Sequence, residues 1–285
     1  MSAFWDTINA GHARQAAGKQ SEARAEFERA LSLTAIDDEK ADAFLKIGWS
    51  FCGEGNHLQG AASFEKVAAL YTCDSYRKSL AQLQAAHCYN HAQKPTEARA
   101  AYEKVLAVQG ANPWNKSNAL KTLAHLLVNE GRARYREART AFERVSKMDD
   151  GHPHDVSESM NMVGNLFWWD SVDRYYREAR SWWQKVVAFP GAHPQHQSHA
   201  QGMIGHSYRH EGNYPAAIEE FQKVLALEFG HPHNQSDAQL QIGAICFDLL
   251  KHDRAREELH KVAQIRGGHE DHVRQAQSYL GRIKS

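Results

Sequence analysis

Histidine is the residue type in this sequence that can perform the widest range of chemistry, because imidazole titrates near neutrality and can bind a proton, a metal ion or a hydrogen-bond partner. The 285-residue chain contains 18 histidines. Two pairs have members four residues apart, His87 with His91 and His206 with His210. That spacing places both rings on one face of a helix, so these four residues are the best local candidates if the protein binds a metal.

A metal site is still the less favoured interpretation. In the His-Pro-His sequences at 152–154 and 231–233, proline separates an expected helix cap from the helix, and no carboxylate or cysteine recurs beside these histidines. The four cysteines, at positions 52, 73, 88 and 246, have no paired close spacing. We therefore expect reduced, packing thiols rather than disulfides or a zinc site, and no cofactor.

A repeated phrase, A-x-x-x-F/Y/W-x-x-V/A, predicts the elements that position the histidines. Its central positions follow one another in steps of 37, 38, 40, 41, 38 and 38 residues. Those positions are Phe27, Phe64, Tyr102, Phe142, Trp183, Phe221 and Leu259. Seven copies at one period indicate a repeat array along the whole chain.

Each repeat is predicted to be a helical hairpin. A small residue usually precedes the aromatic position by sixteen residues, as Gly48 and Gly205 do, with apolar residues one before and three after it. Such spacings of three and four residues are typical of helices. We expect a helix A that carries the small residue, a short turn, and a helix B that carries the aromatic residue. Extra residues around 132–134 and 171–173 indicate longer turns.

The chain resembles the tetratricopeptide repeat family. The resemblance rests on Ile204-Gly205, Tyr208, Ala217 and Phe221, which match the family signature, and the pattern extends from about Phe4 to Ile283. It implies an all-α, right-handed superhelix whose concave surface, lined by the A helices, binds a peptide. The units here are about four residues longer than the usual family unit.

Residues before each helix A account for that extra length. A polar residue, often His followed by Pro, is expected to cap a helix A that is one turn longer than usual, as in His193-Pro194 and His231-Pro232. His152 and His269 are expected to cap in the same way. A serine recurs five residues after each cap, inside the helix, at positions 79, 117, 157, 198 and 236.

The sequence therefore predicts one solenoid domain over residues 1–285. We expect seven hairpins, at approximately 4–36, 37–73, 74–111, 112–151, 152–192, 193–230 and 231–268. Residues 269–285 are expected to form a capping helix that covers the last hairpin. Fifteen helices result.

The stripe of helix A opposite the small residue is predicted to face the concave groove. Its residues are mainly His, Asn and Trp, which favours recognition of a ligand. The expected peptide-binding residues are Trp49, His87, His91, Trp114, Lys121, His125, Asn129, His154, Asn161, Asn165, Trp169, His206, Arg209, His210 and His233. Tryptophans would supply apolar contact, asparagines would hold backbone amides and histidines would hold acceptors, with Trp169 as the favoured anchor.

A basic subset of these residues suggests an acidic ligand. In one subgroup of the family, Lys with Asn or Arg on helix A holds an acidic chaperone tail. Lys121 with His125 resembles half of that clamp, but the neighbouring repeats do not continue it, so we expect no chaperone-tail receptor. Lys121 and Arg209 are each expected to hold one carboxylate.

Charge and composition narrow the remaining function classes. Lys and Arg total 34, equal to Asp and Glu, so nucleic acid and anionic membranes are not expected as main partners. No apolar stretch approaches the length of a membrane span, and the N-terminus lacks a signal-like apolar core, which predicts a cytoplasmic protein.

Two alternatives to a peptide-binding scaffold stay open. The motifs of phosphate loops, nucleophile elbows, zinc proteases and dinucleotide sites are absent from the sequence, so an enzyme is the less favoured interpretation. An enzyme, or a metal or small-molecule binding protein that uses the groove histidines, is the alternative. Self-association through the end helices is the third possibility.

Overall fold

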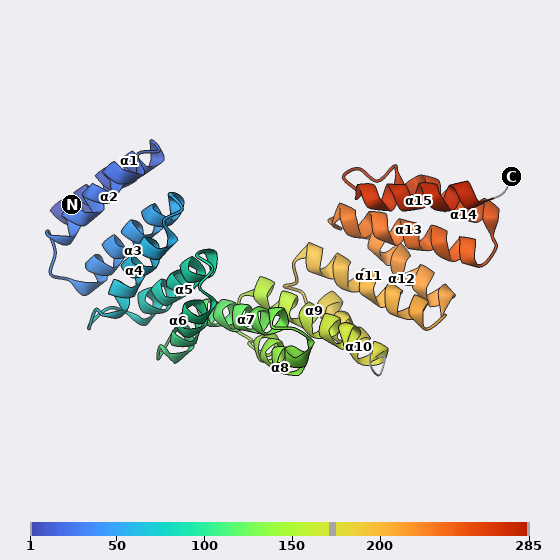
Figure 1. Ribbon diagram of the computed structural model, residues 1–285, viewed down its shortest axis with the longest axis horizontal. Helices are drawn as coiled ribbons and strands as arrows, with labels where there is room; N and C mark the ends of the chain where they lie inside the picture. The colour runs from blue at the N-terminus through green and yellow to red at the C-terminus, as the bar shows by residue number, and fades with distance from the viewer. Residues whose placement is uncertain (1, 171–174, 284–285) are drawn as a thin grey trace. The chain divides into compact units, whose positions relative to one another are not determined.

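The computed structural model describes residues 2–170 and 175–283, and the regular elements of those ranges are all helices (Figure 1). Fifteen α-helices and one short 3₁₀ helix follow one another, and no strand occurs in this part of the chain. The all-α fold of helical hairpins predicted from the repeat is confirmed. The helices form two compact units, which are described separately: Met1–Asn129 with Asp149–His152, and Glu130–Met148 with Pro153–Ser285.

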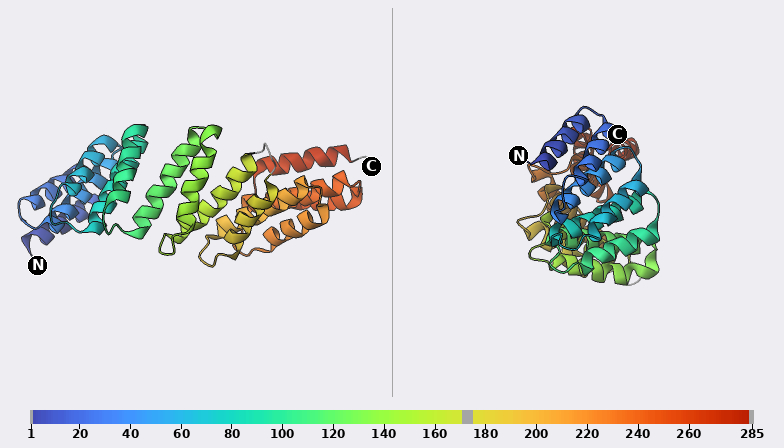
Figure 2. Two further views of the ribbon diagram at one scale, coloured as in Figure 1. Left: turned by 90° about the horizontal axis from the view of Figure 1, so that it is seen from below. Right: turned by 90° about the vertical axis from the view of Figure 1, so that its left-hand side faces the viewer.

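The first unit contains three hairpins and one further helix A. Its helices are α1 (Ala3–Ala16), α2 (Gln20–Leu31), α3 (Asp37–Gly53), α4 (His57–Ala68), α5 (Ser75–His91), α6 (Pro95–Ala107) and α7 (Pro113–Asn129). Successive helices in a hairpin pack along their lengths and are joined by short turns, so they run antiparallel (Figure 2).

The second unit begins with the 3₁₀ turn η1 (Arg132–Arg134) and α8 (Tyr135–Ser146), where the sequence predicts a longer turn. Three hairpins follow: α9 (Pro153–Trp169) with α10 (Tyr176–Ala188), α11 (Pro194–His210) with α12 (Tyr214–Ala226), and α13 (Pro232–Asp248) with α14 (His252–Val262). Helix α15 (Glu270–Arg282) packs on both α13 and α14, as expected of a capping helix. The second predicted long turn, at 171–173, lies outside the described residues.

Contacts between a glycine and an aromatic ring hold four of the described hairpins together. The aromatic residues of the B helices are buried, and in the hairpins of Phe27, Phe64, Trp183 and Phe221 the ring lies against the glycine of its own helix A. A Cβ atom added at Gly205 would lie 2.7 Å from the Phe221 ring, and one added at Gly164 would lie 2.5 Å from the Trp183 ring. Glycine is required at these positions because the ring occupies the space of a side chain.

The predicted capping histidines begin three of the A-type helices. His193, His231 and His269 have extended backbones, and the Nδ1 atom of each accepts the backbone N–H two residues later, at 3.3 Å. This arrangement satisfies one of the free N–H groups at a helix start. Six A helices, α3, α5, α7, α9, α11 and α13, are 17 residues long, in line with the predicted extra turn.

The recurring serines link each repeat to the next one. All five are fully buried, and each hydroxyl donates to the carbonyl three residues earlier. Four of them also accept the backbone N–H of the next cap residue: Ser79 from Asn112, Ser117 from His152, Ser198 from His231 and Ser236 from His269. A buried hydroxyl on one helix A therefore fixes the start of the following helix A.

Within each unit the A helices lie on the inner side of the stack. Helix α3 packs on α5 and α5 on α7 in the first unit, while α9, α11 and α13 pack in succession in the second. Over the described ranges, no two B helices of successive hairpins pack on each other to this extent. Closer spacing of the A helices makes their side the concave one. No described helix is long and apolar enough to cross a membrane.

Candidate functional site

The inner face of the first unit has a cavity at the junction of α3 and α5. It has a volume of about 270 Å³ and is lined by Asp42, Leu45, Lys46, Trp49, Tyr76, Arg77 and Leu80. The Lys46 ammonium lies 5.2 Å from the centre of the Trp49 ring, and Tyr76 is 54% exposed. The Arg77 guanidinium binds both carboxylate oxygens of Asp42, at 2.8 and 3.0 Å. This cavity is therefore lined by two aromatic rings and by charged groups of both signs.

A second cavity lies at the next junction, between α5 and α7, and its lining is more polar. Its volume is about 260 Å³, and its lining residues are His87, Asn90, His91, Tyr102, Asn118 and Thr122. His87 Nε2 lies 3.1 Å from Oδ1 of Asn118, so it links the two helices across the junction. His91 is exposed. The structure therefore places two of the predicted binding residues, His87 and His91, at one cavity.

The remaining predicted residues of the first unit lie along α7. Trp114 is 55% exposed, and its ring centre lies 4.6 Å from that of His152. Lys121 and His125 are half-buried on the same helix, whereas Asn129 is exposed at its end. None of these four residues lines either of the two cavities just described.

A row of polar contacts joins successive A helices in the second unit. Asn165 Oδ1 of α9 lies 3.4 Å from His199 Nε2 of α11, and His206 Nε2 of α11 lies 2.7 Å from Asp237 Oδ2 of α13. Arg209 of α11 also reaches α13. It donates to Gln241 and, at 3.1 Å, to Asp248. Three side chains predicted to bind a ligand, Asn165, His206 and Arg209, are therefore also bonded to the next A helix.

A third cavity lies beside this row, at the junction of α11 and α13. Its volume is about 270 Å³, and it is lined by Ser198, His199, Gly202, Met203, His206, His233, Asn234, Asp237 and His272. Burial lowers the pKa of His199, and the positive charge of a protonated His206 would add to that effect. Burial is the largest single influence on Asp237 and would raise its pKa, but the hydrogen bond and charge of His206, together with Gln241 and His272, outweigh burial and lower that pKa. The cavity thus carries a neutral imidazole next to a carboxylate.

Other predicted residues of the second unit are less uniform in exposure. Asn161 is 4% exposed and its Nδ2 donates to the carbonyl of His196 at 3.1 Å, so we leave it out of the binding face. The Trp168 ring packs on Trp183, whereas Trp169 is 44% exposed.

His210 is exposed, but its ring packs edge-on against the Trp168 ring, with 4.8 Å between the ring centres. That contact places it beside the aromatic end of the preceding hairpin. It does not line the third cavity, whereas His206 and His233 do. His210 therefore belongs to the surface at the end of α11.

Among the residues that the structure describes, three groups of side chains have ligand atoms close enough to share a metal ion, all within 4.8 Å of one another in each group. They are Cys52, His57 and Cys88; His233, His269 and His272; and His154, Glu158 and His196. The four histidines singled out by their i,i+4 spacing belong to none of these three groups. Spacing within one helix does not reveal these three groups, because each group combines residues from different helices.

The comparisons with known proteins agree with the all-α fold of helical hairpins. Residues 198–231 match the family model described as a tetratricopeptide repeat. No curated protein sequence matches the chain. The C-terminal part of a TPR repeat-containing protein from Cytophaga hutchinsonii has a similar structure, with a TM-score of 0.66 and 9% identity over 94% of this chain and 98% of that one.

Two further solved structures have the same fold. PilF of Pseudomonas aeruginosa is 16% identical over 86% of this chain and 99% of its own, with a TM-score of 0.57. A tetratricopeptide repeat protein from Parabacteroides merdae is 13% identical over 97% and 98% of the two chains, with a TM-score of 0.52. With the sequence match at 198–231, they show that this chain has the helical-hairpin fold of tetratricopeptide repeat proteins.

Proposed function

We propose that the chain is an interaction scaffold that captures a peptide segment on the inner faces of its A helices. The observation that carries this proposal is the pair of cavities on the inner face of the first unit, at the α3–α5 and α5–α7 junctions. An extended peptide passing over successive A helices would place an apolar side chain at Trp49 and Tyr76 and a polar one at His87 and His91. Aromatic anchors beside polar groups are typical of peptide recognition.

The inner face of the second unit supports the same role. Its cavity presents His206 and His233, and Arg209 lies on the same helix as His206. These groups favour a segment that carries carboxylates. Lys121 and His125 on α7, and Trp169 at the end of α9, are further proposed contacts.

Selection of peptides from a displayed random library on the wild-type protein would supply the ligand for a direct test. The best peptide would then be titrated into Tyr76→Ala and His91→Ala variants, one for each cavity, by isothermal calorimetry. Both side chains are largely exposed, so we expect folding to be preserved. Affinity should fall about 10-fold or more in each variant, which corresponds to about 1.4 kcal/mol.

Glu103→Ala supplies the matched control, since Glu103 is exposed on helix α6, a B helix. It should bind the selected peptide like the wild type. Equal affinity in all three variants, or selection of no peptide at all, would contradict the proposal.

A further inference from the structure

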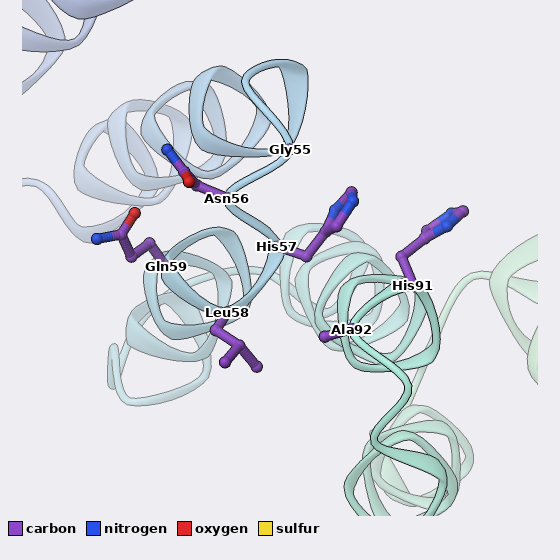
Figure 3. A pocket seen from close by; sticks show the side chains of 7 residues that line it. All are labelled: Gly55, Asn56, His57, Leu58, Gln59, His91 and Ala92. Carbon is purple, nitrogen blue, oxygen red and sulfur yellow. The ribbon is translucent and has the colours of Figure 1, made fainter.

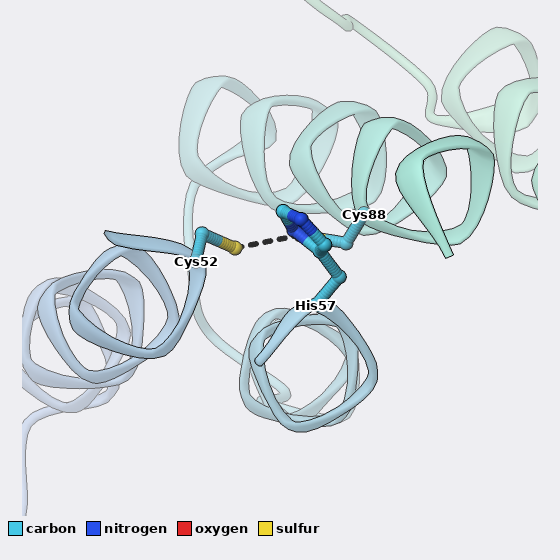
Figure 4. Close-up of side chains that lie close together, drawn as sticks. All are labelled: Cys52, His57 and Cys88. Carbon is cyan, nitrogen blue, oxygen red and sulfur yellow. Dashed lines mark hydrogen bonds between the residues drawn. The ribbon is translucent and has the colours of Figure 1, made fainter. Parts of the chain in front are cut away.

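A cluster of two cysteines and one histidine joins three helices of the first unit (Figure 4). Cys52 lies in the last turn of α3, His57 is the first residue of α4, and Cys88 lies in α5. The two Sγ atoms are 2.8 Å apart, and the His57 ring reaches in beside them from the third helix. One potential ligand atom from each residue lies within 4.8 Å of the other two.

The local backbone is shaped to bring these side chains together. Gly55 has a φ of +79°, a left-handed conformation that glycine adopts readily, and it closes the turn that returns His57 toward Cys52. Gly60 leaves space for the thiols, because a Cβ atom there would lie 2.5 Å from Sγ of Cys52 and 3.4 Å from Sγ of Cys88. Packing of α3 on α5 then places the second thiol opposite the first.

The electrostatics of the cluster favour a cation. The hydrogen bond with Cys88 lowers the pKa of the Cys52 thiol to about 6, and His57 acts in the same direction against the opposing effect of burial. The shared bond raises the pKa of Cys88. His57 Nδ1 is buried and has no hydrogen-bond partner among the described residues, and a buried ring nitrogen without a partner is costly. A metal ion would satisfy both the thiolate and this nitrogen.

One residue of the cluster, His57, lines a neighbouring cavity. A cavity of about 600 Å³ is lined by Gly55, Asn56, His57, Leu58, Gln59, His91 and Ala92 (Figure 3). The rings of His57 and His91 stack at its edge, with 5.0 Å between their centres and 21° between their planes. This cavity provides an entry path for an ion and room for a water molecule as an additional ligand.

We propose that Cys52, His57 and Cys88 bind one Zn²⁺ ion, with the fourth coordination position open toward this cavity. Two thiolates and an imidazole are a ligand set that zinc prefers in tetrahedral sites. Zn–S bonds of about 2.3 Å require sulfur atoms about 3.7–3.8 Å apart, so the thiols would separate by about 1 Å on binding. The ion replaces the thiol protons, and up to two protons are released to solvent for each zinc bound.

Zinc bound in this way would cross-link the second and third hairpins, because its ligands come from α3, α4 and α5. Binding to the folded state alone stabilises that state by mass action. The same two thiols can also form a disulfide, which is the competing outcome that the experiment must separate from metal binding.

The test uses the full chain, reduced and freed of metal by a chelator. Zinc would be titrated in competition with a chromophoric chelator, and Co²⁺ would report thiolate ligation through its charge-transfer absorption. We expect one zinc per chain with thiolate ligation. Cys52→Ser and Cys88→Ser should each weaken binding by at least about 100-fold, and His57→Gln by about 10-fold or more, since even the loss of a residue that only supports a ligand costs about 10–100-fold.

Cys73→Ser is the matched control, because Cys73 is a buried thiol of the same unit outside the cluster. It should bind zinc like the wild type, and circular dichroism in chelator would show that each variant is folded. The proposal is overturned if the reduced, folded protein takes up no zinc. It is overturned in the same way if Cys52 and Cys88 only form a disulfide once the reductant is removed. It is also overturned if binding survives in Cys52→Ser and is lost in a His233→Ala, His272→Ala double variant.

Discussion

The buried hydroxyl of Ser236 accepts a hydrogen bond from the backbone N–H of His269, at 3.1 Å. The same oxygen lies 2.8 Å from Nδ1 of His272 and donates to the carbonyl of His233 at 2.9 Å. One side chain thereby bonds to the first turn of its own helix, α13, and to the start of α15. Equivalent contacts recur at the other serines of the series.

Replacement of Ser236 by alanine leaves the His269 N–H without its acceptor. A buried donor that loses its partner costs about 1–3 kcal/mol. We therefore expect the free energy of unfolding to fall by about that amount in Ser236→Ala, measured by urea denaturation. Ser181→Ala should change it little, because Ser181 is exposed and bonds only within its own helix. Equal effects of the two substitutions would contradict a linking role.

Gly205→Ala tests the contact between helix A and helix B. The new methyl group would lie 2.7 Å from the Phe221 ring, which is fully buried and has no room to move aside. Overpacking of this kind typically costs about 1–3 kcal/mol. Gly281→Ala is the control, since nothing lies within 4 Å of a Cβ there and alanine favours a helix by up to about 1 kcal/mol. The melting temperature should fall in Gly205→Ala and rise in Gly281→Ala.

Acid is expected to destabilise the second unit through His196. Burial, helped by the nearby His154, lowers the pKa of His196 to about 4, whereas an unfolded histidine titrates near ~6.5. Between these values the unfolded chain binds more protons, so the free energy of unfolding falls as the pH drops from about 6.5 to 4. The stabilisation that the neutral His196 provides is fully present above about pH 6.5.

His196→Gln should flatten the dependence of the melting temperature on pH between 7 and 5. His260→Gln, at an exposed position of α14, should keep the wild-type slope. An unchanged slope in His196→Gln would assign the acid sensitivity to other groups.

Binding of an acidic peptide should tighten as the pH falls through the ordinary histidine range near ~6.5, because protonated imidazoles attract carboxylates. Fluorescence anisotropy with a labelled acidic peptide at pH 7.5 and 6.0 would measure this change. A peptide of the same length with glutamines in place of the acidic residues is the control. Affinity for the acidic peptide that does not vary with pH would count against the proposed contacts.

The repeat period predicted much of the fold because its physical basis is local. The spacing of Gly205 and Phe221 follows from one hairpin, and the cap formed by His231 follows from two neighbouring residues. Both features can be derived from short sequence offsets. The all-α architecture therefore required no knowledge of long-range packing.

Contacts between helices of different repeats could not be predicted from such short sequence offsets. Cys52 follows its small residue by four positions and Cys88 follows its own by two, so periodicity gave no reason to pair them. Their approach depends on how far α5 is shifted along α3. The same holds for the contact of His206 with Asp237, which depends on the shift between α11 and α13.

The row of polar contacts along the inner face has a consequence for any ligand. His87, His206 and Arg209 already have partners on the next helix, so an incoming peptide must exchange bonds with Asn118, Asp237 or Asp248. The net gain from each exchange is small, because one hydrogen bond replaces another. Affinity would then come mainly from apolar side chains covered at the aromatic positions, while the exchanged bonds would reject sequences that cannot replace what they displace.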